Sequence, residues 1–100
     1  MNEITAVSEI TAADVAEYIR LSELTVDDEN TINTIIGVAK TYISKYTGIP
    51  EDELDSYQDF VIVVFVLAQD MWDNRSLYVD TTNLNHVVET ILGMHAVNLL

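Results

Sequence analysis

The chain has no cysteine, one proline and only three glycines in 100 residues. Without cysteine it can form neither disulfides nor thiolate metal sites. So few glycines leave no Gly-rich phosphate loop and no nucleophile elbow. The longest apolar run, Phe60 to Ala68, is far shorter than the ~20 residues that span a bilayer. The first ten residues, MNEITAVSEI, lack the basic and apolar regions of a secretory signal. We therefore expect a soluble protein made in a cytoplasm, without membrane contact.

Basic residues are also scarce. The chain has four lysines and arginines in total and 17 acidic residues, which gives a net charge of −13. Binding to a DNA backbone uses Lys and Arg to release counterions, so a nucleic-acid binder is disfavoured, as is adhesion to an anionic membrane. The charge fits a basic partner, a solubility role, or a surface that DNA passes without sticking.

The length and the hydrophobic content of 49% predict one domain over residues 1–100 with a modest core. Two capping-box patterns, Thr11-x-x-Asp14 and Thr25-x-x-Asp28, predict helix starts. The first helix should end near residue 21, and the second should run to the stop signal at Gly48. The sequence leaves open whether residues 1–10 are a flexible arm or a docking strand.

The stretch from residue 56 to residue 75 predicts a long central helix. Its apolar residues recur at helical spacing, and Ser56-x-x-Asp59 is a third capping-box pattern. Three further apolar residues lie off the main face, so the middle of this helix is apolar nearly all round and must be covered on more than one side. The cover is either a two-sided core within one subunit or a neighbouring subunit. We predict a subunit interface at these three residues: Ile62, Val63 and Val66.

A final helix should begin after Asn83 and bend or end at Gly93, which leaves residues 94–100 as a partly extended tail. Together these elements predict an all-α fold, a small bundle of about four helices. The loop at 76–82 is unusual because it holds three bulky apolar residues. We predict that this loop and the tail contact a partner protein or a neighbouring subunit, the alternative being local packing or disorder. The residues concerned are Leu77, Tyr78, Val79, His95, Val97, Leu99 and Leu100.

The sequence contains few candidate catalytic or metal-binding residues. His86 and His95 are nine residues apart, which does not suit metal chelation from one helical face. Asp70 and Asp73 are one turn apart, but a solvated helix end explains them more simply. The acidic connector at 51–55 lacks the ligand pattern of an EF-hand loop. We expect no catalytic, cofactor or metal site, and no enzymatic activity.

The order of motifs resembles one known family. Tyr-Ile-Arg-Leu (18–21) leads to an acidic helix start (27–29), then to Ile-Ile-x-x-Ala-x-x-Tyr-Ile (35–43) and Tyr-Thr-Gly (46–48). A long apolar helix ends in Met-Trp-Asp-Asn-Arg (71–75), and Val-Val-Glu-Thr-Ile-Leu-Gly-Met-His (87–95) follows a variable loop. This order, over about residues 11–95, resembles the small head–tail connector (adaptor) proteins of tailed bacteriophages and prophages. One departure is Ile-Arg-Leu in the first helix, where the family usually reads Leu-Arg before its loop.

The resemblance implies a structural, non-enzymatic function in the virion. Such proteins assemble as a ring of roughly a dozen copies below the portal, closed by a repeated head-to-tail contact. The resemblance therefore makes the loop and tail residues listed above candidates for contact with the portal protein or a neighbouring copy. The ring extends the channel through which DNA passes without specific binding, and it presents a platform for a head-completion or tail protein. The alternative, from a different functional class, is an acidic DNA-mimic inhibitor that binds a basic enzyme or regulator one-to-one.

Overall fold

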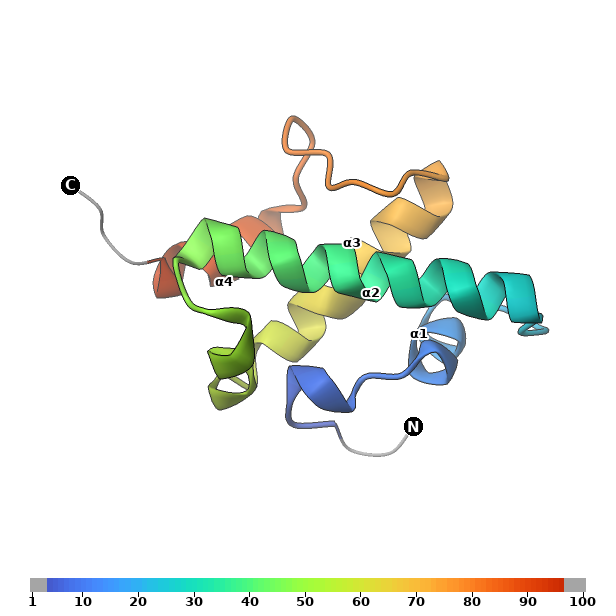
Figure 1. The fold of residues 1–100 in the computed structure, drawn as a ribbon. Helices are drawn as coiled ribbons and strands as arrows, with labels where there is room; N and C mark the ends of the chain where they lie inside the picture. The colour runs from blue at the N-terminus through green and yellow to red at the C-terminus, as the bar shows by residue number, and fades with distance from the viewer. Residues whose placement is uncertain (1–3, 97–100) are drawn as a thin grey trace.

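The computed structural model of the chain describes residues 4–96, and within this range it contains helices and no strand (Figure 1). Four α-helices are accompanied by two short 3₁₀ helices. In chain order these are η1 (Val7–Glu9), α1 (Ala12–Tyr18), α2 (Val26–Thr47), η2 (Glu51–Ser56), α3 (Phe60–Asn74) and α4 (His86–His95). The predicted all-α bundle of about four helices is confirmed.

The first two helices begin where their capping residues predict. The Thr11 hydroxyl accepts a hydrogen bond from the Asp14 N–H at 3.2 Å, and the Asp14 carboxylate accepts one from the Thr11 N–H at 2.9 Å. The Thr25 hydroxyl accepts from the Asp28 N–H at 3.1 Å at the start of α2. The other end of α2 closes at Gly48, whose φ of 79° is the left-handed conformation that glycine adopts without strain.

The start of α3 differs from the prediction. Ser56 does not cap this helix but ends η2, and α3 begins only at Phe60. Its N-cap residue, Asp59, makes no capping hydrogen bond with its side chain. The reason is that the acidic connector forms a 3₁₀ helix of its own, which buries Leu54 against the core. Local capping chemistry at Ser56 is therefore overridden by tertiary packing.

Residues 4–10 form neither a flexible arm nor a strand. They include η1, and they bury Val7 and Ile10 in the core. Ser8 ties this segment to η2, because its N–H and its hydroxyl both donate to the Asp55 carboxylate, at 2.9 Å and 2.6 Å. The Ser8 hydroxyl, followed by the Ser8 N–H, holds the pKa of Asp55 below its ordinary value.

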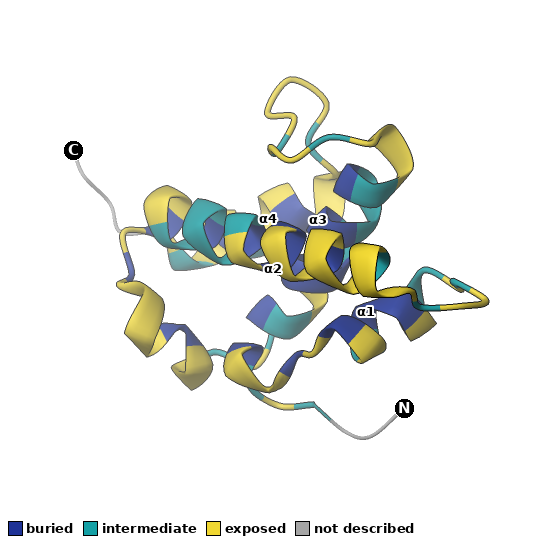
Figure 2. Cartoon of the chain, turned by 45° about the vertical axis from the view of Figure 1, so that its right-hand side comes forward, coloured by how far each residue is buried: buried dark blue, intermediate teal, exposed yellow. Residues whose placement is uncertain are grey.

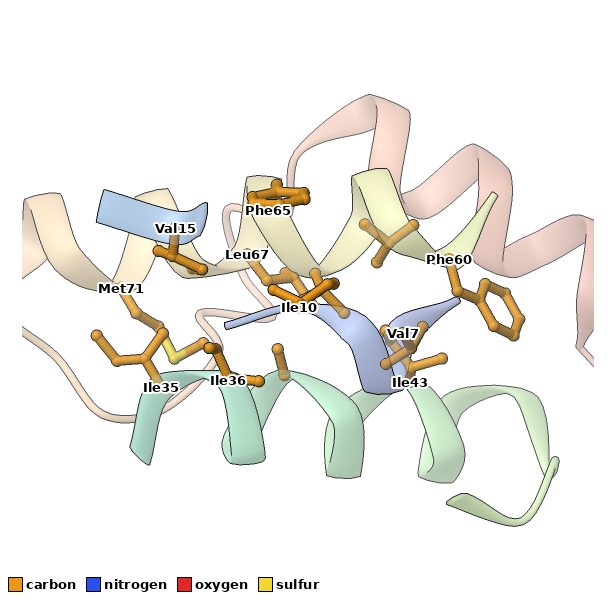
Figure 3. Close-up of a cluster of buried hydrophobic side chains, with 14 of the residues drawn as sticks. Val7, Ile10, Val15, Ile35, Ile36, Ile43, Phe60, Phe65, Leu67 and Met71 are labelled. Atoms are coloured by element: carbon orange, nitrogen blue, oxygen red, sulfur yellow. The ribbon is translucent and has the colours of Figure 1, made fainter. Parts of the chain in front are cut away.

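The core is built around α3, which packs against α1, α2 and α4. Figure 3 shows Phe60, Leu67 and Met71 of α3 directed toward α2. On another side of α3, the Phe65 ring meets the Tyr18 ring of α1 with 5.0 Å between centroids. In Figure 2 the buried residues face inward from all four helices, while the outer face of α2 is largely exposed. One subunit thus covers most of the apolar run, though not all of it.

The last helix is longer than predicted. It continues through Gly93 to His95, so residues 94 and 95 are helical and do not belong to an extended tail. Val88 and Leu92 are buried beneath it and fix it to the bundle. None of the described helices combines the length and the apolar character that crossing a membrane requires.

Candidate docking surface

The loop between α3 and α4 is held in shape at both ends. At its start, the Ser76 N–H donates to the Met71 carbonyl and the Arg75 N–H to the Trp72 carbonyl, which ends α3 in a Schellman turn. Farther along, the Asp80 carboxylate accepts from the N–H groups of Thr82 and Asn83 at 3.0 Å and 3.2 Å.

The Asp80 carboxylate also accepts a hydrogen bond from the Asn83 side-chain amide at 3.0 Å. The side-chain bond from Asn83, followed by its backbone bond, lowers the pKa of Asp80. The carboxylate therefore stays charged and fixes the turn at neutral pH. Hydrogen bonds therefore fix both ends of the segment between Arg75 and Asp80.

That segment displays two large apolar side chains to solvent. Leu77 is 55% exposed and Tyr78 is 68% exposed, whereas Val79 packs partly against the core. The three residues predicted as a contact loop thus divide into two exposed side chains and one anchor. Figure 2 shows this loop as a largely exposed projection beyond the bundle. Exposed apolar side chains on an ordered loop are typical of a binding surface.

A shallow groove of about 570 Å³ lies between this loop and the outer face of α2. Most of its lining is apolar or small, with one lysine and one glutamate among the polar residues. The lining residues are Thr34, Gly37, Val38, Thr41, Tyr42, Lys45, Glu51, Leu77, Tyr78 and Val79. The loop and the groove together form what we call the loop–α2 surface.

The polar residues of the groove are organised by contacts with one another. The Thr41 hydroxyl donates to the Glu51 carboxylate at 3.3 Å, which joins α2 to η2. The Tyr42 ring lies 5.9 Å from the Tyr46 ring, centroid to centroid. Burial raises the pKa of the Tyr42 phenol, and the charges of Tyr46 and Glu89 raise it further. Tyr42 is therefore neutral at physiological pH and acts as an apolar wall with a hydrogen-bonding tip.

A smaller cavity of about 120 Å³ lies beneath the same loop, at the C-terminal end of α3. It is lined on one side by Asp70 and Asn74 and on the other by loop residues that include Asp80. Burial, followed by the neighbouring charge of Asp73, raises the pKa of Asp70. Among residues 4–96, no three His, Cys, Asp or Glu side chains converge in a way that could hold a metal ion.

The predicted subunit-interface residues do not share one environment. Val63 is 0% exposed and packs in the core of its own subunit, so its assignment to an interface is wrong. The physical reason is that Val63 faces inward, where α3 is covered on several sides. Ile62 is 40% exposed, and Val66 is half-buried at the edge of the core.

His95 was expected to contact a portal protein or neighbour, but it is engaged within the subunit. Its Nε2 lies 2.7 Å from the Asp59 carboxylate, and its ring meets the Tyr57 and Phe60 rings edge-on at 5.0 Å and 4.9 Å. It therefore joins α4 to the start of α3. Because the His95 side chain is still 24% exposed, its contact with a portal protein or a neighbouring subunit stays a prediction. Val97, Leu99 and Leu100 lie outside the described residues.

Sequence reasoning missed the α2 side of the loop–α2 surface. Thr34, Gly37 and Thr41 recur at spacings of three and four, so they share one side of the helix with Val38 close by. A run of small residues at helical spacing was the available signal. Tyr42, on the same helix, also forms part of the groove wall.

Comparisons with known proteins found no matching family model, no matching curated protein and no matching solved structure.

Proposed function

We propose that this protein is a structural subunit of the head–tail connector of a tailed bacteriophage. In this role it forms a ring of roughly a dozen copies below the portal, extends the DNA channel and receives a head-completion or tail protein. It acts in the virion after synthesis in the host cytoplasm. It requires no cofactor and performs no catalysis.

The loop–α2 surface is the observation that carries this proposal. Leu77 and Tyr78 are exposed on a loop whose two ends are fixed by hydrogen bonds. A pre-ordered loop loses little conformational entropy when a partner binds, so its apolar area is available for affinity. An aromatic and an aliphatic side chain beside a shallow apolar groove are suitable anchors for a protein partner such as the portal.

The distribution of charge supports the same role. The acidic residues near the start of α2 (27–29) and those of η2 (51–55) flank opposite ends of a 22-residue helix, which is about 33 Å long. The net charge of −13 repels the phosphate backbone, as a channel wall for sliding DNA requires.

The proposal is tested by binding to purified portal rings of the virion from which the protein comes. The wild-type chain should bind, and electron microscopy should show an added ring below the portal. Replacing both exposed loop residues, Leu77→Ser with Tyr78→Ser, should weaken binding by about thirtyfold or more, because buried anchors of this kind contribute about 2 kcal/mol.

Val26→Ser is the matched control, since Val26 is an exposed apolar residue at the start of α2 and outside the groove. It should leave portal binding unchanged. Absence of any wild-type binding to portal rings would contradict the connector role. If the loop variant binds portal rings as tightly as the wild type, the loop is not part of the interface.

The acidic DNA mimic ranks second. Such an inhibitor needs a continuous row of carboxylates, whereas the two acidic groups described above are separated by the length of α2. Native mass spectrometry with a basic nuclease or repressor distinguishes the two functions. A tight one-to-one complex without ring formation would favour the mimic.

A further inference from the structure

Gly37 lines the groove of the loop–α2 surface, and nothing in the described part of its own subunit requires a glycine there. It lies in the interior of α2 and is exposed. A Cβ built at this position would meet no atom within 4 Å. The glycine with a positive φ in the described residues is Gly48, so Gly37 has ordinary helical geometry. Neither crowding within the subunit nor backbone conformation accounts for this glycine.

A glycine at this position weakens the free helix. After proline, glycine is the poorest helix former, because it loses the most backbone freedom on folding. Alanine would fit the open space above Gly37 and would stabilise α2. Glycine, however, lets a second backbone approach the helix more closely than any other residue does. The position therefore suits a close contact with an element outside the subunit.

The surroundings of Gly37 have the shape that such a contact needs. The floor of the groove follows α2 from Thr34 to Lys45, a length of about 17 Å, which matches about three turns of a second helix. The loop side of the groove carries Leu77 and Tyr78, which are exposed on a loop fixed at both ends. An element that lies in the groove thus rests on bare backbone at Gly37 and packs sideways against two large apolar side chains.

The occupant that fits this groove is an α-helix. On the α2 side, the backbone N–H and C=O groups are bonded within the helix, so an extended segment would find no partner for its own backbone groups there. Residues 4–96 contain no strand whose edge could accept such a segment. A helix satisfies its backbone groups internally and needs only side-chain packing in a groove. A glycine at the crossing point allows the two helix axes to approach closely.

The charge around the groove indicates a basic helix. Glu51 lines the groove, and the charge of Glu89 acts on the phenol of its wall residue Tyr42. Asp80 directly follows the loop residues that form the other side. Among the lining residues Lys45 alone is basic. On a chain with a net charge of −13, lysine or arginine residues that flank a partner helix are therefore attracted to the rim of the groove.

We propose that the loop–α2 surface receives an α-helix of the portal protein, which crosses α2 at Gly37 and carries lysine or arginine residues on its flanks. The inference rests on the proposed connector function, and it names the element of the partner that this surface takes. It also gives Gly37 a role that the fold of the free chain does not provide.

Substitutions at Gly37 should move stability and binding in opposite directions. Gly37→Ala should raise the melting temperature of the free chain by about 4 °C, because alanine is the better helix former. The same variant should bind purified portal rings at least about tenfold more weakly, because the added methyl group enters a close contact. Gly37→Leu should bind more weakly still. A purely structural role would not separate the two measurements.

Gly93→Ala is the matched control. Gly93 is also exposed within a helix, has open space around it and lies outside the groove lining. Its substitution should leave portal binding unchanged.

Glu51→Gln tests the predicted charge of the partner helix. Glutamine keeps an acceptor for the Thr41 hydroxyl but removes the negative charge. Portal binding should weaken about threefold at low salt, and this difference should shrink as salt is added. Unchanged binding at low salt would reject the basic flank.

If Gly37→Leu binds portal rings as tightly as the wild type, no helix crosses at Gly37 and the inference is overturned. The connector role then still stands, because binding by the wild-type chain tests it separately. If the wild-type chain does not bind portal rings, the connector role fails and the inference fails with it.

Photo-cross-linking identifies the partner element directly. The chain has no cysteine, so Thr34→Cys carries a single thiol in the groove lining, to which a benzophenone maleimide can be attached. Mass spectrometry of the cross-linked portal should find residues spaced three or four apart, which lie on one side of a helix. Val26→Cys, outside the groove, should cross-link far less. Cross-linked residues at every second position would indicate an extended segment and overturn the inference.

Discussion

The His95 imidazole and the Asp59 carboxylate meet at 2.7 Å, and this contact joins the last turn of α4 to the residue that precedes α3. The two residues are 36 positions apart in the chain. The aromatic rings of Tyr57 and Phe60 pack against the same imidazole. The contact therefore combines a polar bond with ring packing, and it is the main tie at the end of α4.

Removing this tie should destabilise the domain. We expect His95→Ala to lower the free energy of unfolding by about 1–3 kcal/mol, because both a hydrogen bond and two ring contacts are lost. His86→Ala, at the exposed start of the same helix, should change it by less than about 0.5 kcal/mol. Urea denaturation measures both values. A double-mutant cycle with Asp59→Ala separates the polar part, and additive effects would show that the two side chains do not interact.

The bond from Ser8 to Asp55 should make stability depend on acid pH. These hydrogen bonds lower the pKa of Asp55 in the folded protein below the 3.8 of the free side chain. The stabilisation is therefore present above about pH 4 and is lost as the pH falls through the folded-state pKa. Ser8→Ala should lower the melting temperature at pH 7, and the difference from wild type should shrink as the pH falls through this range. Ser22→Ala, at an exposed bend, is the control, and a difference independent of pH would contradict this linkage.

Both arginines of the chain occupy left-handed backbone positions at helix ends, with φ of 61° at Arg20 and 54° at Arg75. Glycine adopts this conformation without the penalty of about 1 kcal/mol that other residues incur. We expect Arg20→Gly to raise the free energy of unfolding by about 0.5–1 kcal/mol. Arg20→Ala should give no such gain, because it keeps the Cβ.

Arg75→Gly should gain less than Arg20→Gly. The Arg75 guanidinium lies 4.7 Å from the Trp72 ring centroid, and this cation–π contact is worth about 0.5–1 kcal/mol at an exposed site. In Arg75→Gly the loss of this cation–π contact offsets the stability gained by relieving the left-handed backbone conformation. Thermal melting of both variants measures the comparison, and a larger gain at position 75 would contradict the assigned contact.

Truncation should destabilise the protein more at Val63 than at its neighbour Ile62. Val63 is fully buried, so Val63→Ala should cost about 2 kcal/mol through lost burial and an unfilled cavity. Ile62 is partly exposed, so Ile62→Ala should cost less than about 1 kcal/mol in the monomer. Chemical denaturation at low protein concentration measures both. Equal costs would contradict the burial that distinguishes them.

The sequence alone determined the helical class, the start of α1 and the full extent of α2. These depend on local chemistry: a side-chain oxygen that accepts an N–H at Thr11 and Thr25, and a glycine at the left-handed position after α2. Hydrophobic spacing likewise indicated that the central segment is a helix that must be covered on more than one side, but it left open whether the cover is the same subunit or a neighbouring one.

Tertiary structure decided what local patterns leave open. Ser56 does not cap α3, because residues 51–56 form η2 and bury Leu54. His95 contacts Asp59, a residue that is far away in the sequence. Only packing separated Val63, which faces the core, from Ile62, which faces outward. Spacing along a helix fixes the relative directions of side chains, but which direction is covered depends on the neighbouring helices, and their placement is a property of the whole chain.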